Sequence, residues 1–158
     1  MADSQVTIDS AGPARLAEIA LRAAGRPGDW LRLIRYDAGN RWYRRLALSD
    51  EAEVWLLSWL PGQSTGFHDH GPSSGAFTVV LGTLAEHSAR AGVPEPRGRT
   101  LTRGAVRSFG PGYVHDVRND SADPAVSIHA YGPRLTSMRR FGVSPGGLLL
   151  SRVEAGPW

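Results

Sequence analysis

The chain has 158 residues, of which 41% are apolar and 21% charged, a composition typical of one globular domain with a substantial core. It contains no cysteine, which excludes disulfides, thiolate metal sites and a cysteine nucleophile, so a bound metal would need histidine or carboxylate ligands. All 18 basic residues are arginines scattered among 15 acids, with no nucleic-acid-binding motif and no membrane-spanning run, so we expect a cytoplasmic monomer with no nucleic-acid or membrane partner.

The first part of the chain predicts a small helical segment. Residues 14–24 follow Pro13, carry an apolar stripe and stop at Gly25, which is typical of an amphipathic helix. Asp29 can cap a second, short helix that includes residues 30–34. We therefore expect a single domain over residues 1–158, in which 1–38 form a helical N-terminal segment.

From residue 41 the sequence predicts short strands broken by glycine and proline. The expected strands cover 41–48, 53–60, 76–81, 83–90, 100–103, 106–109, 113–118, 126–131 and 148–153. Residues 134–141 are ambiguous, and one interpretation is an irregular turn. This pattern favours an all-β antiparallel barrel or jelly roll over residues 41–153.

Two histidines stand two residues apart, just before the apolar strand expected at 76–81. On an extended strand, the side chains of His68 and His70 point to the same face, whereas Asp69 points away. Both imidazoles can therefore reach one metal ion. A histidine pair of this kind is by itself a weak signal, because most such pairs are surface or core residues.

The surrounding glycines extend this pair into a longer motif, G-x5-H-x-H-x4-G-x6-G, which begins at Gly62. A second motif, G-x5-G-P-G-x2-H-x3-N, begins at Gly104 and contains His115. Together they resemble the two motifs of the cupin superfamily, which implies a cupin jelly-roll barrel with His68, His70 and His115 as metal ligands. The cupin pattern expects a glutamate where this chain has Gly75, so the resemblance implies a site of three neutral ligands with open positions.

The run from Ser127 to Tyr131, S-I-H-A-Y, carries a resemblance to one particular family within this superfamily. With H-D-H-G-x-S-x-G and G-P-G-Y-V-H, it resembles the cysteine dioxygenase family of thiol dioxygenases. Alternation places Ser127, His129 and Tyr131 on one strand face. The resemblance implies that they form a relay that orients the tyrosine hydroxyl beside the metal. Animal members carry at Gly75 a cysteine that is cross-linked to the tyrosine, and this chain has no cysteine for that bond.

The family also holds the substrate carboxylate with an arginine two residues after a tyrosine on an early strand. Tyr43-Arg44-Arg45 matches, so the resemblance implies that Arg45 binds substrate beside Tyr43, with Trp59 as a pocket wall. A guanidinium can bind a carboxylate through two parallel hydrogen bonds. Related enzymes that act on 3-mercaptopropionate carry glutamine near this place, so Arg45 favours an amino-acid thiol such as L-cysteine.

The implied activity is therefore an Fe(II)-dependent dioxygenase that oxidises L-cysteine with O2 to cysteine sulfinate. Ligand type alone leaves zinc, nickel and manganese open. Two alternatives remain at this point. One is a three-histidine cupin dioxygenase that acts on 3-mercaptopropionate or another small acid, and the other is a cupin that binds a small ligand as a sensor without turnover.

Overall fold

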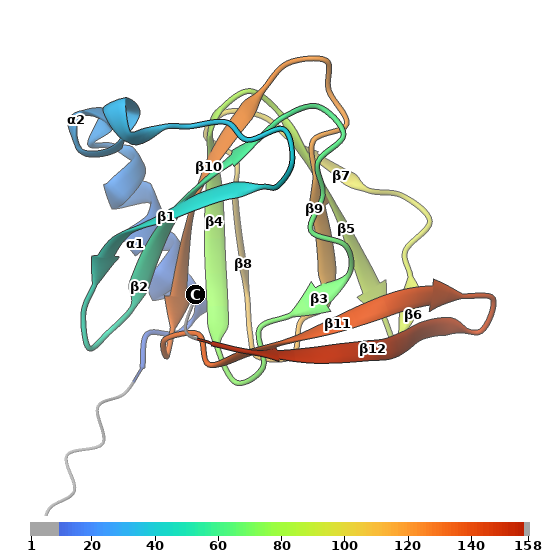
Figure 1. Ribbon diagram of the computed structural model, residues 1–158. Coiled ribbons are helices and arrows are strands. Elements are labelled where there is room, and N and C mark those ends of the chain that lie inside the picture. Colours follow the sequence, from blue (N-terminus) through green and yellow to red (C-terminus); the bar gives the residue numbers. More distant parts are fainter. Residues whose placement is uncertain (1–9, 157–158) are drawn as a thin grey trace, which may run out of the picture.

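The computed structural model describes residues 10–156, so the first nine residues of the predicted helical segment lie outside it. Two antiparallel sheets curl around a common interior and form a barrel (Figure 1). One sheet has the order β1 (Trp42–Leu48), β2 (Glu53–Trp59), β10 (Ala125–Gly132), β4 (Ser74–Leu81), β8 (Val106–Phe109). The other contains β12 (Gly147–Ala155), β11 (Ser137–Ser144), β3 (His68–Asp69), β9 (His115–Arg118), β5 (Leu84–Arg90), β6 (Val93–Pro94) and β7 (Arg99–Leu101). The predicted all-β antiparallel barrel with a helical N-terminal part is confirmed.

The central strands of the five-stranded sheet are buried on both faces. On β10, Val126, Ile128 and Ala130 pack into one apolar cluster with the N-terminal helix, on the outside of the barrel. The intervening Ser127, His129 and Tyr131 are buried in the interior. Strand alternation therefore divides β10 into a packing face and a polar interior face.

The helices cover the outer face of this sheet (Figure 1). α1 (Pro13–Ala24) buries Leu16 and Ala20 completely, as its apolar stripe predicts. The second predicted helix is shorter than expected, because α2 (Pro27–Trp30) passes directly into a 3-10 turn at Leu31–Leu33. Among residues 10–156, neither helix has the length and apolarity needed to cross a bilayer.

A long hairpin of β11 and β12 crosses one end of the barrel (Figure 1). The interpretation of residues 134–141 as an irregular turn is therefore wrong. Exposed residues interrupt the alternation on both strands, so the local pattern is weak. The hairpin is held by pairing to β3, where Arg140 lies opposite His68. This contact joins segments far apart in the sequence and brings the hairpin beside the histidine pair.

The packing of α1 on the sheet can be tested with two leucines of the same helix. Leu16 is fully buried whereas Leu21 is 43% exposed. We expect Leu16→Ala to lower the free energy of unfolding by about 2–5 kcal/mol and Leu21→Ala to change it by less than about 1 kcal/mol. Urea denaturation followed by circular dichroism measures both. Equal losses in the two variants would contradict this packing.

Candidate metal centre

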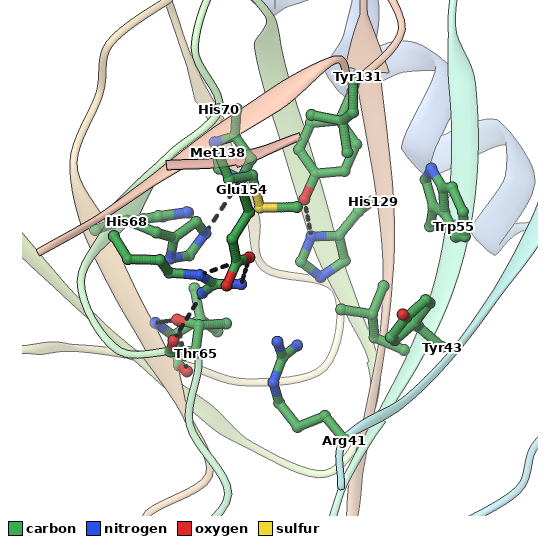
Figure 2. Close-up of a pocket in the computed structure, with 15 residues that line it drawn as sticks. Arg41, Tyr43, Trp55, Thr65, His68, His70, His129, Tyr131, Met138 and Glu154 are labelled. Carbon is green, nitrogen blue, oxygen red and sulfur yellow. Dashed lines mark hydrogen bonds and ion pairs between the residues drawn. The ribbon is translucent and has the colours of Figure 1, made fainter. Parts of the chain in front are cut away.

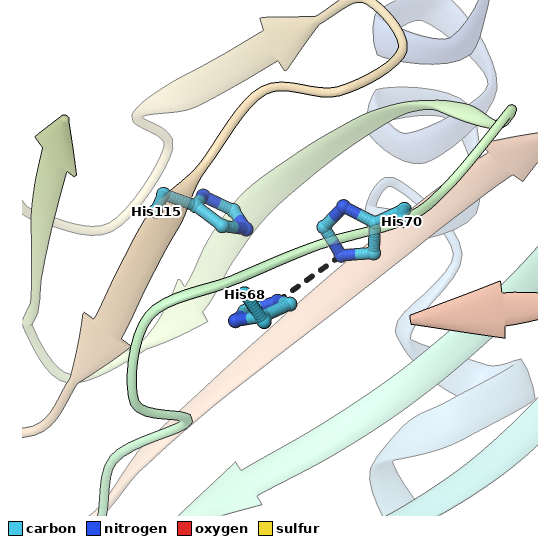
Figure 3. A group of neighbouring side chains, drawn as sticks. All are labelled: His68, His70 and His115. Carbon is cyan, nitrogen blue, oxygen red and sulfur yellow. Dashed lines mark hydrogen bonds between the residues drawn. The ribbon is translucent and has the colours of Figure 1, made fainter. Parts of the chain in front are cut away.

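Three histidines from two separate parts of the chain meet inside the barrel (Figure 3). His68 lies on β3 and His70 directly after it, while His115 begins β9 opposite His68. The Nε2 atoms of His68 and His70 are 3.2 Å apart, and one nitrogen from each of the three rings lies within 4.8 Å of the others. All three side chains are buried.

In His68 and His115, the Nδ1 atom points away from the other two histidines. Its hydrogen bond determines which nitrogen carries the proton and which faces the cluster. The Nδ1 of His68 lies 2.9 Å from the carbonyl of Gly66, which can only accept, so this nitrogen carries the proton. The Nδ1 of His115 likewise donates to a carboxylate oxygen of Glu86 at 3.0 Å. Both rings therefore present an unprotonated Nε2 inward. The Nδ1 of His70 is buried without a partner among the described residues.

These imidazoles are suited to bind a metal. Burial, followed by the nearby histidines, lowers the pKa of His70 well below its ordinary value, and burial together with His115 does the same for His68. Both rings are therefore neutral near pH 7, the form that binds a metal. Three imidazoles without a carboxylate or thiolate suit Fe, Zn, Ni or Cu ions that keep open coordination positions. The donor set thus fits a three-histidine metal centre.

Gly75, where the cupin pattern expects a glutamate, lies on β4 between β8 and β10, opposite Phe109 and Tyr131. A Cβ there would stand 2.5 Å from the Phe109 ring and 3.0 Å from the Tyr131 ring, so no side chain fits without rearrangement. Phe109 instead stacks on His70 with ring centroids 5.2 Å apart. An aromatic ring occupies the space through which a fourth, anionic ligand would reach the centre.

A chain of hydrogen bonds runs along the interior face of β10. The Nε1 of Trp59, which can only donate, lies 2.9 Å from Ser127 Oγ. Ser127 has no other acceptor in the described part of the chain than His129 Nε2, 2.8 Å away, and therefore donates to it. His129 then carries its proton on Nδ1 and donates to the Tyr131 hydroxyl at 3.0 Å. Because the Tyr131 oxygen accepts this hydrogen bond, its own proton remains available to donate to a molecule bound inside the barrel.

The protonation states agree with this order of donors. Burial, followed by the neighbouring His115, lowers the pKa of His129 well below its ordinary value, so the ring carries a single proton near pH 7. Burial also raises the pKa of Tyr131 far above its ordinary value, so its phenol keeps its proton. Because the Tyr131 ring lies 4.8 Å from that of His70, this donor stands beside the histidine cluster.

A cavity of about 240 Å³ opens onto the three histidines, His129 and Tyr131 (Figure 2). Tyr43, on the edge strand β1, lines this cavity, and its contact with substrate stays a prediction. Trp59 does not line it. Trp59 is fully buried behind the cavity, where it contacts Ser127 and lies under the guanidinium of Arg41, 5.1 Å from its ring centroid.

Arg45 does not lie where the resemblance implied. It is absent from the cavity lining and packs over the Trp55 ring, 5.6 Å from its centroid, with Nη1 3.7 Å from the buried carboxylate of Glu53. That acid attracts the guanidinium, while Trp55 itself lines the cavity. The arginine that enters the cavity from this strand is Arg41, one residue before β1 (Figure 2).

The residues that line the cavity but were not identified from the sequence include Arg41, Met138, Arg140 and Glu154. Arg41 lies two residues before Tyr43, so strand alternation places the two side chains on one face. The sequence could therefore have indicated Arg41 as a neighbour of Tyr43. Met138, Arg140 and Glu154 come from the β11–β12 hairpin, of which the sequence predicted only the second strand, at 148–153. Arg140 contacts the carboxylate of Glu154 at 3.1 Å and donates to the carbonyl of Thr65 at 3.0 Å. Its charge is thus already paired.

Comparison with known proteins agrees with this geometry. Residues 14–144 match the family model described as cysteine dioxygenase type I. The chain belongs to the cysteine dioxygenase type I family. Cysteine dioxygenase type 1 of Danio rerio is 27% identical over 136 residues, which is 76% of this chain and 65% of the relative. The chain therefore spans slightly less than two thirds of that family member's length.

Solved structures of other proteins share this fold. The TT1209 protein of Thermus thermophilus is 26% identical with a TM-score of 0.59, covering 67% of this chain and 95% of its own. A Klebsiella pneumoniae protein with a double-stranded β-helix domain is 19% identical with a TM-score of 0.57, covering 77% of this chain and 92% of its own. At that identity the likeness shows the fold, which confirms a cupin barrel for this cysteine dioxygenase family member.

The buried histidines predict a pH-dependent stability of the metal-free protein. The unfolded chain takes up protons below its ordinary histidine pKa of about 6.5, whereas folded His68, His70 and His129 resist protonation. The unfolded state thus binds more protons, and the free energy of unfolding should fall as pH drops from about 7 to about 5.5, above the range in which carboxylates titrate. Urea denaturation in the presence of a chelator measures this. Stability that is flat or rises over this interval would contradict it.

Proposed function

We propose that this protein is an Fe(II)-dependent thiol dioxygenase that converts a small thiol carboxylate and O2 into the corresponding sulfinate. The observation that carries the proposal is the meeting of three buried imidazoles beside the Tyr131 hydroxyl. Membership of the cysteine dioxygenase type I family supports it. The reaction balances without a further reductant, because both oxygen atoms of O2 end on the sulfur.

His68, His70 and His115 would hold the iron through their Nε2 atoms. Bound in such a set, Fe(II) supplies positions for a thiolate and O2 and the redox chemistry that joins them. Three neutral ligands leave the ion's charge of +2 uncompensated by the protein. The centre therefore favours anionic ligands, of which a thiolate is one.

We assign the substrate carboxylate to Arg41 instead of Arg45. Arg41 lines the cavity and makes no ion pair within residues 10–156, whereas Arg140 is paired with Glu154. Burial lowers the pKa of Arg41, yet a guanidinium remains protonated near neutral pH. A half-buried cation without an acidic partner gains more from a carboxylate than one that is already neutralised.

Tyr131 then acts as a hydrogen-bond donor to the bound reactants. Its hydroxyl accepts from His129 Nδ1, so its own proton points elsewhere. The order of donors from Trp59 through Ser127 keeps this orientation. The residues of β10 thus orient one proton at the edge of the centre, and Arg41 orients the substrate from the start of β1, the edge strand of the same sheet.

The cavity suits a small substrate, since pockets for larger ligands measure roughly 300–1,000 Å³ and this one about 240 Å³. With Arg45 outside the cavity, the reason for preferring L-cysteine over 3-mercaptopropionate no longer holds. Both carry a thiol and a carboxylate. The name of the Danio rerio relative favours L-cysteine as the first candidate.

Oxygen uptake by iron-loaded protein tests the activity. We expect uptake with one sulfinate formed per O2 for L-cysteine or 3-mercaptopropionate, and slower uptake for cysteamine, which lacks a carboxylate. His115→Ala should lose both iron binding and uptake, because two histidines hold an ion weakly. An oxygen electrode and mass spectrometry of the products measure this. If the iron-loaded protein consumed no oxygen with any thiol, the sensor alternative would be favoured.

Two matched variants test which arginine holds the carboxylate. We expect Arg41→Met to lower kcat/KM for the carboxylate substrate about 10- to 100-fold, since charge-assisted hydrogen bonds contribute about 1.5–3 kcal/mol. The same variant should leave cysteamine turnover nearly unchanged. Arg45→Met, on the same strand face, should affect neither substrate selectively. A carboxylate-selective loss in Arg45→Met alone would return the role to Arg45.

A further inference from the structure

The three histidines of the centre differ in what holds their outer nitrogens. His68 donates to a neutral backbone carbonyl, that of Gly66, and His70 has no partner in the part of the chain that the structure describes. His115 alone donates to a charged group, the carboxylate of Glu86. The arrangement therefore places a single negative charge directly behind one ligand.

Glu86 is a buried acid whose two oxygens are both occupied. Its side chain is 1% exposed on β5, one strand away from His115. Oε1 accepts from His115 Nδ1 at 3.0 Å and from the Tyr113 hydroxyl at 3.3 Å, and Oε2 accepts from Arg107 Nε at 2.6 Å. The guanidinium compensates the charge, and the three donors fix the carboxylate plane against the imidazole.

A buried ion pair that only joins β5 to β8 would account for Glu86 and Arg107 alone. Such an ion pair does not account for the hydrogen bond that Glu86 accepts from His115. The bond to His115 selects the tautomer whose Nε2 faces the centre, and it limits rotation of the ring. A metal-bound imidazole that donates to a carboxylate is also a stronger base than one that donates to a carbonyl.

We propose that Glu86 is a positioning residue of the metal centre, which acts through His115. It supplies, one ring away from the ion, the negative charge that no ligand supplies directly, since Gly75 leaves no room for a carboxylate. The charge strengthens metal binding and stabilises the more highly charged ferric state over the ferrous one. This inference rests on the three-histidine centre of the proposed function, and not on the identity of the thiol.

The test uses metal affinity and reduction potential, measured without thiol. Glu86→Gln keeps the shape of the side chain and removes its charge. We expect it to weaken Co(II) binding about 10- to 100-fold in an anaerobic titration, the usual range for loss of an outer partner of a metal-bound histidine. The Fe(III)/Fe(II) potential of the iron-loaded protein, followed by spectroelectrochemistry, should rise.

Arg107→Gln should shift the Fe(III)/Fe(II) potential in the opposite direction. It removes the compensating cation but leaves the carboxylate on His115, so the potential should fall. Glu95→Gln is the matched control, because the carboxylate of Glu95 pairs with Arg90, whose side chain is 91% exposed, and the variant should change neither quantity. Circular dichroism establishes that each variant is folded.

The outcomes separate the two roles of Glu86. A folded Glu86→Gln protein with unchanged Co(II) affinity and unchanged potential would overturn the proposal and leave Glu86 as a structural ion pair. If Glu86→Gln fails to fold, Arg107→Gln decides, and a potential equal to that of the unaltered protein would overturn it. Because no thiol is present, a failure here is distinct from a failure of the dioxygenase activity.

Discussion

The centre depends on burying three imidazoles with one nitrogen of each turned toward the others. Burying polar nitrogens away from water costs free energy unless each has a partner, and the Nδ1 of His70 has none among the described residues. The fold meets this cost with rigid surroundings. β3, only two residues long, is held between β11 and β9, and this pairing sets His68 opposite His115. Phe109 then fills the remaining side against His70 and excludes a further ligand from Gly75.

The two sheets of the barrel contribute different parts of the chemistry. The seven-stranded sheet carries His68 and His115, whereas β10 of the five-stranded sheet carries the donor chain that ends at Tyr131. Reactants bound between the sheets would meet both. The helices stabilise this geometry from outside, because α1 packs on the outer face of the same β10. A residue such as Leu16 thus supports the site without touching it.

Charge is distributed in layers around the centre. The carboxylate of Glu86 lies behind His115, and the cavity presents Arg41, a cation that makes no ion pair within residues 10–156. Arg140 contributes little free charge because Glu154 lies against it. The centre is therefore open to an anionic sulfur and an anionic carboxylate together, while its redox balance is adjusted from a part of the barrel that the substrate does not reach.

The sequence by itself determined whatever depends on local spacing. Strand alternation predicted that His68 and His70 share a face and that Ser127 and Tyr131 share another, because the two-residue period is a property of the chain alone. The motif that begins at Gly104 indicated His115 as the third histidine, through its resemblance to the second cupin motif. Alternation places Arg41, Tyr43 and Arg45 on one face and could not say which arginine meets the cavity, and the family resemblance favoured Arg45.

Only the tertiary structure decided the remaining parts of the site. The buried carboxylate of Glu53 draws Arg45 away from the cavity, and this contact depends on the pairing of β1 with β2. The β11–β12 hairpin and the bond between Glu86 and His115 likewise join segments distant in sequence. Their register and burial arise from the packing of the whole barrel, which no local pattern records.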